Sequence, residues 1–283
     1  MLKIAIQSKG RLNDESMSLL ADAGIYAASG SRSLVSRAKG FPMEILFLRD
    51  DDIPQAVAMG VADIGIVGLN EVAEKGQSVV EVMRLGFGAC RISIAVPKGE
   101  DYSGPSWLNG RRIATSYPVI LGDYLKTAGI EAEIHEIAGS VEIAPAVGMA
   151  DAIFDIVSSG GTLIQNGLRE VEQVFFSEAV LIARPGLDGE KSAGLEKLKF
   201  RLRSILASRG MKYLLMNIPQ DAVDAAVALL PAMKSPTLLP LAEPGWFSLH
   251  AVVPEEVLWE KIEQLKVIGA EDILVLNLEN IVK

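Results

Sequence analysis

The chain has few of the residues that build covalent cross-links and transition-metal sites. Cys90 is its one cysteine among 283 residues, so the sequence excludes an internal disulfide and a thiolate metal cluster. Its two histidines, His135 and His250, lack the spacing of zinc ligands, and neither adjoins a nucleophile. Because the motif GxSxG is also missing, the sequence argues against a Ser-His-Asp hydrolase.

Long apolar runs and blocks of positive charge are lacking as well. No window approaches the run of about 18 apolar residues that a membrane helix needs. The opening MLKIAIQSKGRL has too short an apolar run for a signal peptide, so we expect a cytoplasmic protein without a membrane partner. The formal net charge of −9, with no cluster of lysines or arginines, argues against a nucleic-acid partner.

Short apolar runs alternate with segments of helical spacing in the first part of the chain. LKIAIQ, MEILFL and ADIGIVG are typical of strands in a sheet that is covered on both faces. NDESMSLLADAG has the spacing of a helix that begins at an N-cap, Asn13, and ends at Gly24. This alternation predicts an α/β fold with a mostly parallel sheet.

Four segments of different character follow one another along the chain. The strands and helices of residues 1–87 form a first lobe, to which a strand at about 179–186 returns. Residues 88–178 form a second α/β lobe, and residues 187–209 form a charged amphipathic helix that connects domains. Residues 210–283 have the element order βαββαβ, which is the ferredoxin-like arrangement.

The apolar run in DAIFDIVSSGGTLIQNGL ends in five residues without bulk. They are Ser158, Ser159, Gly160, Gly161 and Thr162. They place hydroxyls and backbone N–H groups at the start of a helix, where the helix dipole favours negative charge. Glycines let a ligand approach the backbone and can adopt the positive φ of an amide nest. This pattern predicts a phosphate site, with an ordinary strand-to-helix turn and a serine cap as the alternative.

Two carboxylates in the same stretch extend this prediction. We expect Asp151 and Asp155 to accept hydrogen bonds from ribose hydroxyls while the loop holds the sugar's phosphate; the alternative is that either faces solvent. The signature GxxxxGK[ST] is absent, and GFGACR from Gly86 lacks the third glycine of a dinucleotide fingerprint. A Walker-type kinase and a Rossmann dehydrogenase are therefore disfavoured.

Cations and glycines also occur near the ends of other predicted strands. Lys9 and Arg11 follow the first strand, and Arg49 follows the strand MEILFL, at the ends of strands where open α/β sheets bind ligands. Solvated side chains, or an ion pair of Arg49 with its acidic neighbours, are the alternatives. Asp63 and Gly65 lie in VADIGIVG, where either a ligand or a crossing helix would account for the glycine.

Seven stretches of the chain, taken together and in order, resemble one enzyme family. They are QSKGRL, LRDDDIP, VADIGIVG, RIATSYP, GSVEIAP, DAIFDIVSSGGTLIQNGL and MKSPTLLPLAEPGWFSLHAVVP. The resemblance is to ATP phosphoribosyltransferase of the long form, the first enzyme of histidine biosynthesis, and it covers nearly the whole chain.

This resemblance implies a fold and a reaction. The fold is a two-lobed α/β catalytic core similar to type II periplasmic binding proteins, followed by a regulatory ferredoxin-like (ACT-like) domain. The reaction transfers the phosphoribosyl group of phosphoribosyl pyrophosphate to N1 of ATP and releases pyrophosphate, with Mg²⁺ held mainly by substrate phosphates. Inhibition by histidine and homo-oligomers from dimer to hexamer are also implied. The short form lacks the third domain and depends on a partner protein, which we do not expect here.

The resemblance also implies roles for individual residues. Those expected to face the pyrophosphate or the ATP phosphates, as catalytic residues, are Lys9, Arg11 and Arg49. Those expected to bind substrate are Asp151, Asp155, Ser158, Ser159, Gly160, Gly161, Thr162, Leu163, Asp63, Gly65, Thr115, Tyr117 and Glu142. Those expected in regulation are Ser235, Thr237 and Ala270, and no residue is assigned to a metal. Family members often have a lysine where this chain has Ser116, which leaves the roles of Thr115 and Tyr117 open.

Two other functions are compatible with the same features. A two-lobed anion sensor or solute-binding protein with an appended amino-acid-binding domain is the non-enzymatic alternative, although the sequence shows no export signal. A phosphoribosyltransferase with another acceptor is the second, because the hydroxyl-rich loop recognises the donor and not the base.

Overall fold

The computed structural model describes residues 1–27, 34–158, 160–230, 233 and 235–282. The chain divides into two compact units, Met1–Glu196 and Lys197–Lys283. Within the described residues, every helix is too short or too polar to cross a bilayer.

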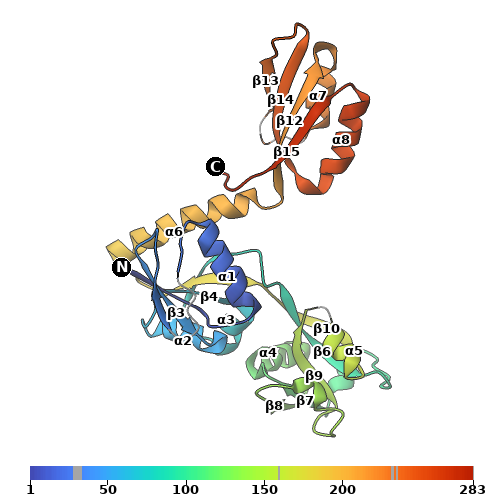
Figure 1. Cartoon of the computed structure of the whole chain (residues 1–283). Helices are drawn as coiled ribbons and strands as arrows, with labels where there is room; N and C mark the ends of the chain where they lie inside the picture. The colour runs from blue at the N-terminus through green and yellow to red at the C-terminus, as the bar shows by residue number, and fades with distance from the viewer. Residues whose placement is uncertain (28–33, 159, 231–232, 234, 283) are drawn as a thin grey trace. The chain divides into compact units, whose positions relative to one another are not determined.

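The first unit contains a six-stranded sheet in the order β2-β3-β1-β4-β11-β5 (Figure 1). Its strands are β1 (Leu2–Gln7), β2 (Val35–Arg37), β3 (Met43–Leu48), β4 (Ile64–Gly68), β5 (Val80–Arg84) and β11 (Ala179–Ala183). The helices of this part are α1 (Arg11–Asp22), α2 (Ile53–Ala58), α3 (Leu69–Lys75) and the short 3₁₀ helix η1 (Asp50–Asp52). Ile4, Ala5 and Ile6 point to alternate faces of β1 and are all fully buried, so both faces of the sheet are covered.

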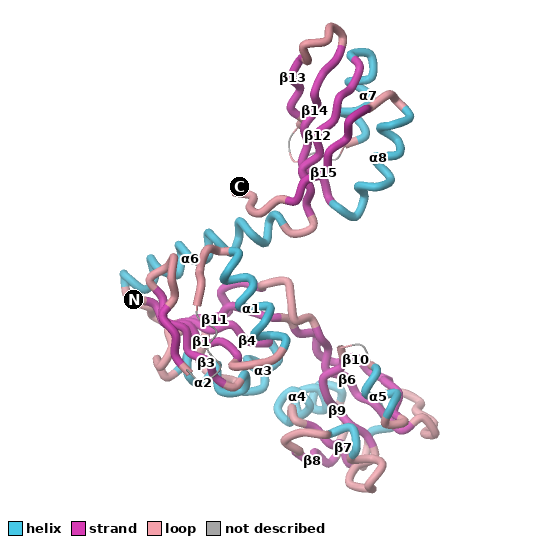
Figure 2. The backbone as a smooth tube through the Cα atoms, in the orientation of Figure 1, coloured by secondary structure: helices cyan, strands magenta, loops and turns pink. Residues whose placement is uncertain are grey.

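Strands β3, β1 and β4 run parallel, whereas β11 comes back from the second sheet and runs antiparallel to β4. The chain leaves the first sheet between β5 and β6 and returns to it between β10 and β11 (Figure 2). Because β1 and β3 are parallel neighbours, the residues that follow them lie at the same end of the sheet.

A five-stranded sheet in the order β10-β6-β9-β7-β8 forms the other half of this unit. Its strands are β6 (Cys90–Pro97), β7 (Arg112–Thr115), β8 (Glu133–Glu136), β9 (Ala152–Val157) and β10 (Leu168–Ser177). The helices are α4 (Pro118–Ala128), α5 (Gly161–Gln165) and the 3₁₀ helices η2 (Pro105–Leu108) and η3 (Val141–Ile143). β9 runs parallel to β7 and antiparallel to β6, and fully buried Phe154 lies at the centre of its core.

The long helix α6 (Gly189–Ser208) leads into the second unit, whose four-stranded sheet has the order β13-β14-β12-β15. Its elements are β12 (Met211–Pro219), η4 (Gln220–Ala222), α7 (Val223–Leu229), β13 (Thr237–Pro240), β14 (Trp246–Pro254), η5 (Glu255–Val257), α8 (Leu258–Val267) and β15 (Glu271–Asn277). All its strand pairs are antiparallel, and β12 lies between β14 and β15. This is the ferredoxin-like βαββαβ arrangement, so the predicted fold class is confirmed.

One local expectation is wrong. Helix α1 begins at Arg11, two residues before the predicted N-cap, and follows Gly10, whose φ of 97° suits glycine. Asn13 therefore lies inside the first turn, where its side-chain amide donates a hydrogen bond of 2.6 Å to the carbonyl oxygen of Gln7. The amide binds the end of β1 instead of capping the helix.

Candidate functional site

The loop between β9 and α5 has the backbone that a bound anion requires. β9 ends at Val157, and α5 begins at Gly161 after Gly160, whose φ is 78°. Among the described residues, no capping side chain accepts a hydrogen bond from the first N–H groups of α5. They therefore remain available to an anionic ligand. Ser158 and Thr162 are exposed, whereas the side chain of Leu163 is 7% exposed and packs in the core, so Leu163 offers only backbone groups. Ser159, also assigned to this loop, lies outside the described residues.

A hollow of about 170 Å³ opens beside this loop. Its lining residues are Glu142, Ile153, Asp155, Ile156, Val157, Ser158, Gly160, Gly161, Thr162 and Leu163. The structure thus brings two predicted carboxylates, Asp155 and Glu142, to the predicted phosphate loop. The lining combines backbone N–H groups and hydroxyls with acidic side chains.

The carboxylate of Asp155 has an altered acidity. Burial and, to a smaller extent, the negative charge of Glu142 raise the pKa of Asp155 to about 6, against the lowering effect of a 2.8 Å hydrogen bond from the backbone N–H of Ile156. Asp155 therefore changes its charge within about one unit of neutral pH, which an exposed aspartate does not do.

An arginine–carboxylate pair that the sequence did not reveal bonds to the first residue of the loop. The guanidinium of Arg91 binds the carboxylate of Glu170 through two hydrogen bonds of 2.5 and 2.6 Å. A third N–H of Arg91 donates 3.3 Å to the carbonyl oxygen of Ser158, the first residue of the loop. Ser93 donates 2.6 Å to the same carboxylate. The partners lie far apart in the sequence, so no local motif reveals them.

The predicted cations gather at one end of the six-stranded sheet. Lys9 and Arg11 follow β1, and Arg49 follows β3, its parallel neighbour. A hydrogen bond of 2.7 Å from Ser8 N to Leu48 O joins the ends of the two strands. The three cations therefore follow two neighbouring parallel strands at the same end of the sheet.

In the part of the chain that the structure describes, the guanidiniums of Arg11 and Arg49 each pair with a partly exposed carboxylate. The side chain of Arg11 is 75% exposed and lies 2.7 Å from Glu15; that of Arg49 is 78% exposed and lies 3.2 Å from Asp51. Exposed pairs of this kind contribute about 0 to 1 kcal/mol. A polyanionic ligand would therefore exchange these partners at little cost.

Tyr117 connects the two sheets through buried hydrogen bonds. Its hydroxyl donates 3.1 Å to Glu71 and receives a bond of 3.3 Å from the amide of Asn70, which also donates 2.9 Å to Glu71. Burial, followed by the charges of Glu71 and Asp155, raises the pKa of Tyr117, and burial raises the pKa of Glu71. Because Glu71 lies on α3 and Tyr117 precedes α4, the network joins the two halves of the first unit.

Side chains of the RIATSYP segment form hydrogen bonds to nearby backbone groups. Thr115 is fully buried and its hydroxyl accepts a hydrogen bond of 2.8 Å from Tyr117 N. The hydroxyl of Ser116 donates 2.7 Å to Ile137 O. Glu74 of α3 accepts 3.0 Å bonds from two backbone N–H groups at the start of α4. The side chain of Thr115 therefore shapes the segment.

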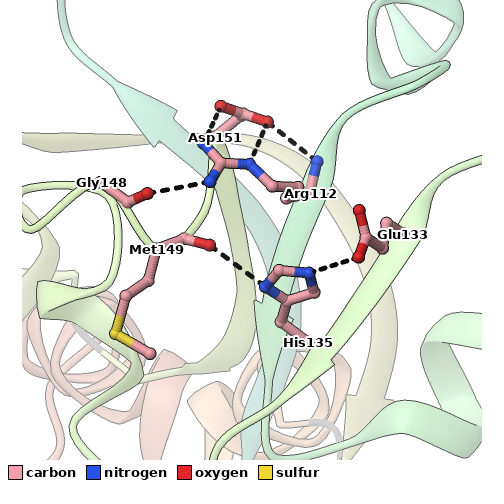
Figure 3. A network of polar contacts seen from close by, with 6 residues as sticks. All are labelled: Arg112, Glu133, His135, Gly148, Met149 and Asp151. Carbon is pink, nitrogen blue, oxygen red and sulfur yellow. Dashed lines mark hydrogen bonds and ion pairs between the residues drawn. The ribbon is translucent and has the colours of Figure 1, made fainter.

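Asp151 directly precedes β9, so it lies at the opposite end of this strand from the loop. Its carboxylate accepts hydrogen bonds from Arg112 Nη2 at 2.9 Å and Nε at 3.3 Å, while Nη1 of the same guanidinium donates 2.9 Å to Gly148 O (Figure 3). A strand rises about 3.3 Å per residue, so Asp151 lies roughly 20 Å from Ser158. The structure therefore places Asp151 away from the loop and pairs it with Arg112, which gives no support to its expected role in binding the ribose.

Asp63 and Gly65 are also placed away from the cation cluster. Asp63 precedes β4, at the amino-terminal end of the parallel strands, where its buried carboxylate binds Lys3 N at 2.9 Å and Lys191 at 2.8 Å. Gly65 lies inside β4, where a Cβ atom would approach Ile53 Cγ2 to 2.7 Å. Asp63 is thus an ion partner of Lys191, and Gly65 lets α2 pack on the sheet, so the structure does not bring either residue to the cation cluster.

The residues expected in regulation lie in the second unit. Ser235 and Thr237 are exposed at the start of β13, whereas Ala270 is buried just before β15. β13 and β15 form the two edges of the four-stranded sheet, so one chain does not bring these three residues together.

Comparisons with known proteins agree on one family. Residues 49–204 match the family model described as ATP phosphoribosyltransferase, and residues 208–280 match the one described as HisG, C-terminal domain. An ATP phosphoribosyltransferase of Parabacteroides distasonis is 56% identical over 282 residues, and one of Bacteroides thetaiotaomicron is 53% identical over 282 residues. Each alignment covers 100% of both chains.

Two solved structures resemble the model. The ATP phosphoribosyl transferase (HisG:HisZ) complex from Thermotoga maritima matches with a TM-score of 0.62 and 30% identity, over 72% of this chain and 96% of that one. A periplasmic binding protein from Brucella ovis with glutathione bound matches with a TM-score of 0.50 and 13% identity, over 80% of this chain and 72% of that one. The second likeness concerns the fold alone.

Proposed function

Because the chain belongs to the ATP phosphoribosyltransferase family, whose members carry out the first step of histidine biosynthesis, we propose that it joins N1 of the adenine ring of ATP to the anomeric carbon of phosphoribosyl pyrophosphate. Family membership favours this transferase over the sensor and over a transferase with another acceptor. The observation that carries the proposal is the hollow beside the loop, where donors for a phosphate and carboxylates for a sugar lie together.

The donor's 5′-phosphate binds at the start of α5. Backbone N–H groups of Gly161 and Thr162, with the hydroxyls of Ser158 and Thr162, surround the phosphate oxygens. Gly160 supports this arrangement because its φ of 78° turns the backbone into the helix without a side chain in the way. The ribose then lies over the hollow, beside Asp155 and Glu142.

The bond change needs no catalytic base. The lone pair of adenine N1 forms the new bond to the anomeric carbon, and the electron pair of the breaking C–O bond leaves with pyrophosphate. The enzyme aligns two large anions and stabilises the charge that develops on them. This requirement fits a site with arginines, lysine and carboxylates, in a chain with two histidines.

The cation cluster of Lys9, Arg11 and Arg49 binds the departing pyrophosphate or the phosphates of ATP. Mg²⁺, when bound, shares the negative charge of the leaving group. The carboxylates of Asp155 and Glu142 supply oxygen ligands of the kind that Mg²⁺ takes, one or two carboxylates completed by substrate phosphates, so the residues present fit such an ion.

Asp155 stabilises positive charge on the sugar. The anomeric carbon becomes cation-like as pyrophosphate leaves, and an ionised carboxylate in the hollow lowers the energy of that state. Because the pKa of Asp155 is about 6, its charge is present at neutral pH and disappears in mild acid.

The second unit regulates this activity through histidine in our proposal. The ferredoxin-like domain binds the end product at Ser235, Thr237 and Ala270 and favours a less active arrangement, with a coupling free energy of about 1 to 3 kcal/mol. Since one chain places Thr237 and Ala270 at opposite edges of its sheet, the proposed homo-oligomer, a dimer or hexamer, supports regulation by bringing copies together.

The reaction can be tested with ATP, phosphoribosyl pyrophosphate and Mg²⁺ by following pyrophosphate release with and without histidine. We expect release that requires both substrates and that histidine reduces. Turnover with another base but not with ATP would refute the acceptor, and binding without turnover would refute the enzyme.

A further inference from the structure

The arginine and carboxylate behind the phosphate loop form a three-point clamp. Arg91 uses Nε and Nη2 on the two oxygens of Glu170 and Nη1 on Ser158 O. Its side chain is 25% exposed and that of Glu170 is 21% exposed, so the pair is largely shielded from water. Arg91 also holds the pKa of Glu170 below its ordinary value, which keeps the pair charged at neutral pH.

The position of this clamp follows from strand register. Arg91 pairs with Val157 across β6 and β9, so its side chain lies alongside the last residue of β9. Glu170 reaches it from β10, which is irregular between Glu170 and Glu172, as expected where a bulge redirects a side chain. Neither Arg91 nor Glu170 lines the hollow.

We propose that Arg91, held by Glu170, is a positioning residue that fixes the first residue of the phosphate loop for the donor. The inference rests on the proposed function. A carbonyl oxygen that points at a phosphate repels it, and the guanidinium holds the carbonyl of Ser158 in a fixed direction. The far end of the loop is fixed independently, by the bonds from Ile164 N to Gly160 O at 3.2 Å and from Asn166 Nδ2 to Thr162 O at 2.9 Å.

The same sheet contains a matched control. Arg112 binds both oxygens of Asp151 and the carbonyl oxygen of Gly148, which repeats the three contacts of Arg91 at the other end of β9 (Figure 3). Arg91→Lys and Arg112→Lys remove the same set of contacts, and only the first lies beside the loop.

The test measures binding of ribose 5-phosphate, of pyrophosphate and of ATP by calorimetry, together with KM for each substrate. With Arg91→Lys we expect the Kd of ribose 5-phosphate to rise about three- to tenfold, since hydrogen bonds to charged groups contribute on this scale. Affinities for pyrophosphate and ATP should stay within about twofold of wild type. Arg112→Lys should leave all three unchanged while lowering Tm. Equal effects of the two variants on ribose 5-phosphate would overturn the proposal.

Glu170→Gln distinguishes a positioning role of Arg91 from direct contact between Arg91 and the phosphate. It also replaces Arg91→Lys as the test if that variant does not fold. It keeps the charge of Arg91 and weakens its anchor, so a positioning role predicts weaker binding of ribose 5-phosphate. Tighter binding would mean that the released guanidinium contacts the phosphate itself, and it would overturn the proposal. If the wild-type protein neither binds ribose 5-phosphate nor releases pyrophosphate, the proposed function itself fails. If the wild-type protein binds ribose 5-phosphate and the variants bind it equally well, only the positioning role of Arg91 fails.

Discussion

The two ends of β9 have the same kind of clamp but different surroundings. At the amino-terminal end, Asp151 forms an ion pair with Arg112, which also bonds to the carbonyl oxygen of Gly148 (Figure 3). At the carboxyl-terminal end, burial and the negative charge of Glu142 raise the pKa of Asp155, and its carboxylate accepts a hydrogen bond from the backbone N–H of Ile156. One carboxylate is therefore paired with an arginine of the fold, whereas the other lies beside a second carboxylate in the hollow.

The pKa values express the same contrast. Hydrogen bonds from Arg112 hold the pKa of Asp151 below its ordinary value, whereas burial raises that of Asp155 to about 6. At neutral pH, ionised Asp151 therefore stabilises the folded protein, whereas ionised Asp155 destabilises it. A buried charge that costs stability at the mouth of a hollow is typical of a functional site.

The largest effect is expected from changing the loop itself. Gly161→Ala with Thr162→Val adds a methyl group beside the phosphate and removes a hydroxyl donor, so kcat/KM for the donor should fall about 100-fold, or about 2.7 kcal/mol. Affinity for ATP should change little, as measured by titration with each substrate. Thr127→Val, which removes a threonine hydroxyl bonded within α4, is the control. Equal losses for both substrates would contradict the assigned loop.

Asp155→Asn should lower the activity of the enzyme while raising its stability. We expect kcat to fall about tenfold to 30-fold, because a neutral amide stabilises a cation-like sugar less well. The free energy of unfolding at pH 7 should rise by about 1 to 3 kcal/mol, since the buried charge is gone.

The sign of the pH dependence checks this prediction. The folded pKa of Asp155, about 6, lies above the pKa of about 3.9 that an aspartate has in the unfolded chain. Its contribution to stability is therefore fully present below about pH 4 and is lost as pH rises to about 6. Denaturant melts at pH 4 and pH 8 should show this loss in the wild type and not in the variant. A variant that is less stable than wild type at pH 7 would contradict it.

Asp151→Asn is expected to have the smallest effect, and only on stability. The pKa of Asp151 is lowered in the fold, so its contribution is present above about pH 4 and is lost as pH falls through its folded pKa. For a partly exposed pair we expect a loss of about 1 kcal/mol at pH 7. Denaturant melts of Asp151→Asn should show this loss of stability at pH 7 and not at pH 3. A changed KM for the donor would instead indicate that Asp151 contacts the substrate.

Most of the architecture can be read from the sequence because local patterns determine it. Apolar runs of strand length, helical spacing and turn residues predict the α/β core and the βαββαβ order, and both are present. The glycine turn between β9 and α5 is predictable for the same reason, because glycine readily adopts the positive φ that Gly160 has there.

The site is predictable only in part, because closeness in sequence does not mean closeness along a strand. Asp151 and Asp63 precede strands and therefore lie at the amino-terminal ends, opposite the residues that follow those strands. Arg91 and Glu170 were missed because they meet through register, 79 residues apart. Pairing across a sheet requires the three-dimensional fold.

A crystal structure with bound phosphoribosyl pyrophosphate tests the central claim most directly. The account predicts the 5′-phosphate within hydrogen-bonding distance, about 3 Å, of the backbone nitrogens of Gly161 and Thr162, with the ribose hydroxyls toward Asp155. A donor bound elsewhere in the same crystal, with no ligand at the loop between β9 and α5, would contradict it.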